Sequence, residues 1–184
     1  MKADPLPARL VQLLVEHRRE PERILALFRE AGYDSAALAK INGMADPSYP
    51  YSRAVLSASP ECEVMLARWS GGRTCAPHDH GASSGWVFYL EEDFEEQGYE
   101  WRAGELAPAW TAVHLAGSYT EVREQEIHSC VCRGSGLSLH IYFPRIANMR
   151  VFDFDERRTI TVADDCGAWI PDRAEQRKQE ETWQ

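Results

Sequence analysis

Most of this chain is a succession of short runs rich in β-branched and aromatic residues, and no other feature restricts its fold as strongly. The runs follow the segment ADPSYPY and are separated by Gly, Pro and Ser: SRAVL, CEVMLARW, GWVFYLEE, FEEQGYEWR, HSCVC, LSLHIYF and MRVFDF. Val, Tyr, Phe and Trp favour strands, and many short strands at close spacing are typical of a β-sandwich or β-barrel. The runs therefore predict an all-β core between residues 48 and 163.

Residues 1–47 follow a different period. Apolar residues there recur at helical spacing, as in Leu10 and Leu14, and again in Ile24 and Phe28. Residues three and four apart lie on the same face of a helix, so this segment predicts two or three short helices ahead of the strands.

The chain has the size of one globular domain. Its 184 residues, 44% of them hydrophobic, can bury one sizeable core, so we expect a single domain over residues 1–184. Within it we expect N-terminal helices at 1–47, a β-barrel at 48–163 and a C-terminal tail at 164–184. The end of the chain, DRAEQRKQEETWQ, has little apolar surface to bury and predicts a solvated tail or a terminal helix.

Charge and cysteine content exclude several classes of function. A net charge of -9 offers no basic surface to nucleic acid or to an anionic membrane, so small-molecule or protein partners are expected. No apolar run approaches the roughly 20 residues that span a bilayer, and MKADPLPARL lacks the features of a signal peptide, so we expect a cytoplasmic protein. The 5 cysteines, odd in number and unevenly spaced, predict free thiols. The sequence predicts no particular oligomeric state.

Two of the 6 histidines, His78 and His80, lie one residue apart at the head of a predicted pair of strands. Strand side chains alternate between faces, so both imidazoles would face one space, where a metal ion is the expected occupant. Together with His128 they would suit zinc, and a structural zinc site could add Cys130 or Cys132. Three imidazoles with open positions would equally hold iron(II). Spacing alone does not choose the metal.

Four segments of the chain resemble the cysteine dioxygenase family of the cupin superfamily. PYSRAVL resembles the family's Tyr-x-Arg segment, and ARWSGGRTCAPHDH resembles its Trp-containing strand leading into the His-x-His pair. The strand that carries His128 resembles the second metal motif of cupins, and SLHIY resembles the Ser-x-His-x-Tyr strand. One such short pattern recurs easily in unrelated chains, whereas four in the right order are specific. The resemblance covers most of the β region and implies a cupin, a jelly-roll-like β-barrel, with a small N-terminal helical segment.

Carried over residue by residue, the resemblance makes His78, His80 and His128 the ligands of Fe(II) (Fe2+), the implied cofactor. Most cupins add a glutamate four or five residues after the His-x-His pair, where this chain has Ser84 and Gly85. Three neutral imidazoles leave the ion its full positive charge, which favours an anionic thiolate and lowers the pKa of a substrate thiol. A sulfur substrate is therefore implied.

The resemblance also implies substrate-binding and catalytic residues. Arg53 would hold a substrate carboxylate, since a guanidinium offers paired donors and stays charged when buried, and Tyr51 would point the same way. Ser138, His140 and Tyr142 share one face of a strand and resemble the family's hydrogen-bonded relay, in which Tyr142 positions the substrate amine or oxygen. Without the resemblance, Arg53 could equally form a structural salt bridge, and the relay strand could be a half-buried strand of mixed polarity.

Neighbouring residues are assigned no catalytic role. In the animal enzymes a cysteine near the His-x-His pair is bonded to the relay tyrosine, but the corresponding position here is Gly85, so that crosslink should be absent, as is common in bacterial members. Cys130 and Cys132 could belong to the core or line the pocket. Trp69 is expected to pack behind the site, and His114 to be an ordinary structural histidine.

The implied reaction adds both atoms of O2 to a small thiol and gives a sulfinic acid. The Tyr51 and Arg53 segment favours L-cysteine as the substrate, with 3-mercaptopropionate and mercaptosuccinate as alternatives. A second carboxylate would need a second cation, so mercaptosuccinate predicts two arginines converging on the pocket. The candidates for the second are Arg73, Arg123, Arg133 and Arg145. A non-redox cupin, either a zinc or manganese isomerase or a binding protein, is an alternative of another class.

Overall fold

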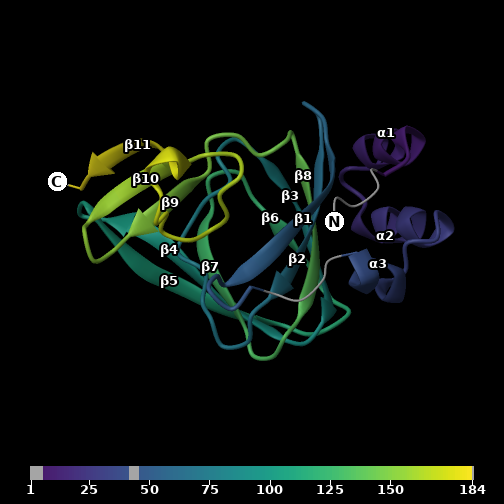
Figure 1. Cartoon of the computed structure of the whole chain (residues 1–184), viewed down its shortest axis with the longest axis horizontal. Coiled ribbons are helices and arrows are strands. Elements are labelled where there is room, and N and C mark those ends of the chain that lie inside the picture. Colours follow the sequence, from purple (N-terminus) through teal and green to yellow (C-terminus); the bar gives the residue numbers. More distant parts are fainter. Residues whose placement is uncertain (1–5, 42–45, 184) are drawn as a thin grey trace.

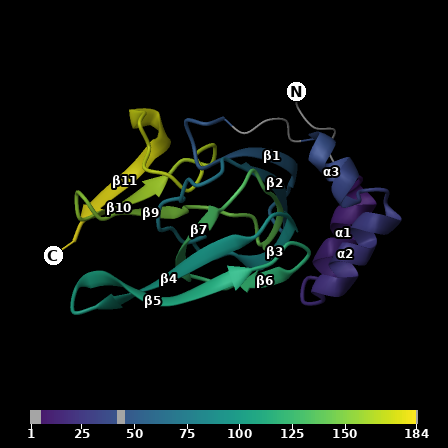
Figure 2. The ribbon, with the colours of Figure 1, turned by 90° about the horizontal axis from the view of Figure 1, so that it is seen from below.

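The computed structural model describes residues 6–41 and 46–183. Three short helices come first: α1 (Ala8–Glu16), α2 (Pro21–Glu30) and α3 (Ser35–Ile41). They lie together on the outer side of one sheet (Figures 1 and 2). Leu14 of α1 and Phe28 of α2 share a hydrophobic cluster with Leu66 and Ile141 of that sheet. No helix in the described part of the chain is long and apolar enough to cross a membrane.

The rest of the chain is almost entirely strand and turn. The strands are β1 (Tyr51–Ala58), β2 (Glu63–Trp69), β3 (Ser84–Glu91), β4 (Phe94–Arg102), β5 (Glu105–His114), β6 (Tyr119–Val122), β7 (Ile127–Cys132), β8 (Leu137–Phe143), β9 (Arg150–Asp153), β10 (Arg158–Val162) and β11 (Arg177–Thr182). Their pairing, antiparallel throughout, gives a sheet of order β1-β2-β8-β3-β6 and two smaller sheets of order β5-β4-β7 and β9-β10-β11.

Strands β2 and β8 lie inside the large sheet, with one face under the helices and the other face toward the interior cavity. Leu66 and Leu139, which are partners in the register, pack under the helices. The neighbouring pair, Met65 and His140, faces the interior, since successive strand residues point to opposite faces. The alternation therefore places the polar side chains of β8 inside the protein, within reach of the histidines on the other strands.

The predicted fold class is confirmed. The chain is mainly β, with antiparallel, jelly-roll-like sheets and a small N-terminal helical segment. The described strands form three sheets rather than one continuous closed barrel. All 5 cysteines are buried and free, as expected.

The expectation of a solvated tail or terminal helix at the end of the chain is wrong. Strand β11 pairs antiparallel with β10, after the short 3-10 helix Ala174–Gln176. Nearly all side chains of β11 are exposed, so its sequence shows no apolar alternation. Backbone hydrogen bonds to β10 form this strand, and hydrophobic pattern could not reveal it.

Candidate metal centre and substrate pocket

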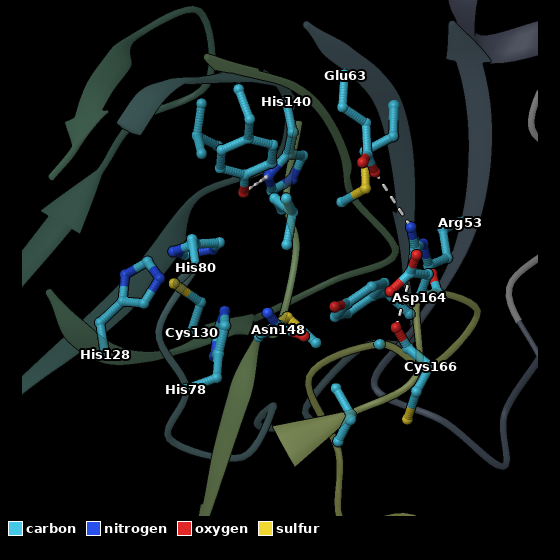
Figure 3. Close-up of a pocket in the computed structure, with 18 of the residues that line it drawn as sticks. Arg53, Glu63, His78, His80, His128, Cys130, His140, Asn148, Asp164 and Cys166 are labelled. Atoms are coloured by element: carbon cyan, nitrogen blue, oxygen red, sulfur yellow. Dashed lines mark hydrogen bonds and ion pairs between the residues drawn. The ribbon is translucent and has the colours of Figure 1, made fainter. Parts of the chain in front are cut away.

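Three buried histidines from two distant segments meet in the interior. His78 and His80 lie between β2 and β3, and His128 lies on β7. Two backbone hydrogen bonds join His78 to His128, with N···O distances of 2.9 and 3.0 Å. One ring nitrogen from each histidine lies within 4.8 Å of those of the other two. Figure 3 shows the three imidazoles converging, which is the cluster that the His-x-His spacing predicted.

Asp79, between the two histidines, fixes the shape of this segment. Its side chain is fully buried and accepts hydrogen bonds from the Arg150 Nε atom at 2.7 Å and from the backbone N–H groups of Gly81 and Arg150. The Arg150 partner neutralises the buried carboxylate. The ligand segment is therefore held rigidly on the side away from the histidine cluster.

The ring nitrogens of this cluster fit a metal ion. His80 Nδ1 and His128 Nε2 are buried without a hydrogen-bond partner in the described structure, although buried polar atoms normally have one. The His78 Nδ1 atom donates to the Ala76 carbonyl oxygen at 2.9 Å, which leaves its Nε2 lone pair available. Burial and the charges of the other two histidines lower the pKa of His80 well below its usual value, so its ring is neutral. An imidazole nitrogen with a free lone pair is the donor that Fe(II) or Zn(II) takes.

Glu96 of β4 supports the cluster from behind. It is buried and contacts both His128 Nδ1 and His114 Nε2, the second at 2.5 Å. Burial opposes ionisation of Glu96, but hydrogen bonds from the two histidines and their charge outweigh it and lower its pKa to about 2. The carboxylate thus holds His128 in the tautomer that directs Nε2 into the cluster. No local sequence pattern indicates this role of Glu96 or a partner for His114.

Cys130 is a further donor near the histidines, whereas Cys132 is not. Cys130 lines the cavity and, with Glu96 and His128, forms a second set of donor atoms within 4.8 Å of one another. Its backbone N–H donates to the Cys75 sulfur at 3.1 Å. Cys132 packs in the hydrophobic interior.

The histidine cluster opens on a cavity of about 50 Å³. That is room for a few water molecules or for a ligand of similarly few heavy atoms. Arg53 lies at the opposite end from the histidines (Figure 3). The loop residues 146–149 and 162–167 contribute to the wall.

Three residues of β8 form one hydrogen-bonded chain, of which His140 and Tyr142 line the cavity. Ser138 Oγ is 2.7 Å from His140 Nε2, and His140 Nδ1 is 3.0 Å from the Tyr142 hydroxyl. Trp69 Nε1 donates to Ser138 Oγ at 2.9 Å, so Trp69 does more than the packing expected of it. The Trp69 N–H can only donate, and His140 is the one other partner of Ser138 Oγ in the described structure. The arrangement that uses every proton therefore has Ser138 donating to His140 and His140 donating to Tyr142.

The direction of this chain leaves the Tyr142 proton free to donate into the cavity. Burial, with the charges of His128, His78 and Arg53, lowers the pKa of His140 to about 3, so that ring is neutral. Burial also raises the pKa of Tyr142 well above its usual value, which keeps the phenol protonated. Tyr142 is therefore a neutral hydrogen-bond donor.

At the other end of the cavity, the guanidinium of Arg53 already has hydrogen-bond acceptors within the protein. Arg53 Nη1 donates to the carbonyl oxygens of Asp164 and Cys166 at 3.1 and 2.6 Å, and its Nη2 lies 3.2 Å from Glu63 Oε1. The Tyr51 hydroxyl accepts the Ala168 N–H at 2.8 Å. Tyr51 and Arg53 both line the cavity, as their common strand face predicted.

Of the other candidate arginines, Arg145 contacts two acids at this end of the cavity but does not line the cavity itself. Its Nε atom lies 3.7 Å from Glu63 Oε2, and its Nη2 atom lies 3.0 Å from Asp164 Oδ2. Arg73 is exposed, while Arg123 and Arg133 pair with exposed acids and line no part of the cavity.

Gly85 faces Tyr142 across the β3–β8 pairing. A Cβ atom at Gly85 would lie 1.9 Å from the Ile141 carbonyl oxygen, so a side chain cannot be added there without moving backbone. This backbone contact accounts for glycine at the position where a glutamate or a crosslinking cysteine would otherwise be sought.

No protein-family model matches this chain, and no curated protein matches it. Its structure is similar to several solved cupins. A cupin superfamily protein from Desulfitobacterium hafniense DCB-2 has 12% identity and a TM-score of 0.47, over 58% of this chain and 86% of that one. An RmlC-like cupin from Shewanella frigidimarina NCIMB 400 has 19% identity and a TM-score of 0.44, over 57% and 86%. KdgF from Halomonas sp. has 16% identity and a TM-score of 0.43, over 52% of this chain and 82% of that one. Such similarity concerns the fold and carries no information about the reaction.

Proposed function

We propose that this protein is a non-haem Fe(II) thiol dioxygenase that adds O2 to a small carboxylate thiol, with L-cysteine giving cysteine sulfinic acid as the favoured reaction. One observation carries the proposal. A single small cavity has imidazole nitrogens with free lone pairs at one end and a guanidinium at the other. These two ends match the two functional groups of such a substrate.

At the histidine end no carboxylate of the described residues lines the cavity, since Glu96 contacts the far side of the His128 ring, and this supports the choice of substrate. Of the described residues that line the cavity, the acids are Glu63 and Asp164, and both lie beside Arg53. His78, His80 and His128 would hold the metal, and Fe(II) bound there would supply the redox chemistry that joins O2 to sulfur. A thiolate is the anion that such a neutral donor set favours.

The residues of the wall would orient the substrate. Arg53 would bind the carboxylate after exchanging one of its internal acceptors, so that a hydrogen bond to a charged carboxylate replaces one to an uncharged backbone carbonyl. Tyr142 would donate its proton toward the bound groups, because Ser138 and His140 fix the direction of its hydrogen bonds. The small cavity would exclude bulk water and keep sulfur and oxygen close together.

Oxygen consumption tests this proposal. Protein loaded anaerobically with Fe(II) is offered L-cysteine, 3-mercaptopropionate and mercaptosuccinate in parallel, and sulfinate is quantified beside O2 uptake. We expect one O2 per sulfinate with at least one thiol, and none with the His128→Ala variant. Iron-loaded protein that consumes no O2 with any of the three contradicts the proposal. Zinc or manganese in the protein as purified would then favour a non-redox cupin, since three imidazoles and a water also suit zinc.

A further inference from the structure

Glu63 is an acid at a place where an anion-binding pocket would not be expected to have one. It is the first residue of β2, its side chain is 5% exposed, and it lies next to the guanidinium that faces the cavity. Figure 3 shows it beside Arg53, joined by a dashed line. Sequence analysis assigned this residue no role.

Glu63 occupies two arginines at once. One oxygen is 3.2 Å from Arg53 Nη2, and the other is 3.7 Å from Arg145 Nε. Burial raises the pKa of Glu63, while the two guanidinium groups oppose that rise and favour the ionised form. Arg145 is held on its other side by Asp164, which also binds Lys178 at 2.7 Å.

The charges of this group leave little capacity for added anions. Arg53, Arg145 and Lys178 give three positive charges, and Glu63 and Asp164 give two negative charges. The excess is one positive charge, which balances one carboxylate. A second carboxylate reaching for Arg145 would meet the buried carboxylate of Glu63, and like charges brought together out of water repel strongly.

We propose that Glu63 restricts the pocket to thiols with a single carboxylate, by keeping Arg145 from serving as a second anion site. The inference rests on the proposed function and narrows its substrate class. In this arrangement Arg53 binds the substrate carboxylate and Arg145 stays paired with Glu63. Mercaptosuccinate is then the least favoured of the three thiols. Glu63 acts as a specificity-determining residue through repulsion rather than through a favourable contact with the substrate.

The Glu63→Gln variant tests this proposal, because the amide keeps the shape and an acceptor oxygen but removes the charge. Mercaptosuccinate and 3-mercaptopropionate differ by one carboxylate and make a matched pair of substrates. We expect the ratio of their kcat/KM values to rise in favour of mercaptosuccinate by about tenfold or more in Glu63→Gln, the size expected from relief of a like-charge contact. Glu61→Gln, which removes an exposed acid two residues away, is the control and should leave the ratio unchanged.

A second variant checks that the gain uses Arg145. Adding Arg145→Gln to Glu63→Gln should return the ratio to that of the unmodified protein, whereas a gain that survives contradicts the assignment. If the kcat/KM ratio of the folded Glu63→Gln variant lies within twofold of the ratio of the unmodified protein, the role of Glu63 is overturned. The proposed thiol dioxygenase activity is not affected by that result.

Binding measured without turnover separates this proposal from the proposed function. Succinate and propionate are titrated calorimetrically into metal-loaded protein, and Glu63→Gln should favour succinate by a similar factor. If no thiol is oxidised by any variant, the dioxygenase proposal fails, and the calorimetric ratio decides on Glu63 alone. An unchanged ratio then overturns its role, and a raised ratio supports it.

Discussion

The two ends of the cavity differ in how their polar atoms are satisfied. At the histidine end, His80 Nδ1 and His128 Nε2 have no hydrogen-bond partner within the described structure, while Glu96 holds the far side of the His128 ring. At the arginine end, Arg53 and Arg145 already have internal acceptors. The histidine end has free lone pairs that can bind a cation, whereas Arg53 must give up an internal acceptor to bind an anion.

This difference separates the expected effects of mutation. Substitutions at the histidine end should change how much metal the protein retains, because the free lone pairs of these histidines are the donors that would bind it. Substitutions at the arginine end should change the KM for the substrate, because the Arg53 guanidinium binds either its internal acceptors or the substrate carboxylate. A variant at one end that produced the effect expected of the other end would break the comparison.

His128→Ala is expected to have the largest effect. It removes one of the three proposed ligands and leaves the remaining two histidines without the third donor, so the protein should retain no stoichiometric iron after dialysis. Metal content by mass spectrometry measures this. His17→Ala, which changes a histidine on the helical side that pairs with Glu20, should leave metal content unchanged. Full iron content in His128→Ala would remove it from the ligand set.

Arg53→Ala should raise the KM for a carboxylate thiol by about 100-fold, the effect of losing a charge-assisted hydrogen bond. Metal content should not change. The variant removes the shorter ion pair of Glu63 and leaves the longer contact to Arg145, so part of any loss of stability comes from that buried acid. The double variant Arg53→Ala, Glu63→Gln removes this complication and should also raise the KM, by less than Arg53→Ala does, because Arg145 is then free to bind a carboxylate. A KM unchanged in both would show that Arg53 is structural.

Glu96→Gln should weaken metal binding by about tenfold or more, because an amide holds the His128 ring less well than a carboxylate does. Competition with a chelator gives the affinity. The matched control is Glu95→Gln, since Glu95 is adjacent on β4 but pairs with Arg133 on the exposed side. Equal affinities in the two variants would mean that Glu96 does not support the metal centre.

The smallest effect concerns His140, on the wall between the two ends. Its pKa is lowered from 6.5 to about 3 in the folded protein, so the unfolded chain takes up a proton first as the pH falls. The stabilising contribution of neutral His140 is therefore fully present above pH 6.5 and is lost progressively toward pH 3. Its slope is at most about 1.4 kcal/mol per pH unit.

Urea unfolding of metal-free protein over this range measures that contribution. The free energy of unfolding of His140→Gln should fall less steeply with decreasing pH than that of the unmodified protein, and His17→Gln should follow the unmodified protein. Parallel curves for His140→Gln and the unmodified protein would mean that His140 is not buried in its neutral form.

Local sequence patterns predicted the parts of the site that lie within single strands or short loops. The pair Tyr51–Arg53 and the relay on β8 follow from the two-residue period of strands, whereas His78 and His80 lie in the segment between β2 and β3, outside any strand. Both pairs line one cavity together with His140 and Tyr142, and Ser138 lies behind His140.

The parts that sequence did not reveal depend on contacts between strands. Glu96 reaches His128 because β4 pairs with β7, and no local pattern distinguishes it from Glu95. Glu63 faces the cavity because β2 lies between β1 and β8, and its partner Arg145 follows β8. The loop that accepts hydrogen bonds from Arg53 is more than a hundred residues away in the chain. Such contacts follow from register and topology, which periodicity does not encode.

The most direct test of the account is whether one small molecule uses both ends of the cavity. Protein loaded with cobalt(II), a spectroscopic substitute for iron, is titrated anaerobically with L-cysteine, and the sulfur-to-metal charge-transfer absorption is followed. The account predicts a saturable band whose midpoint moves to much higher concentration in Arg53→Ala. A cobalt-loaded protein that shows no such band with L-cysteine, 3-mercaptopropionate or mercaptosuccinate would contradict it.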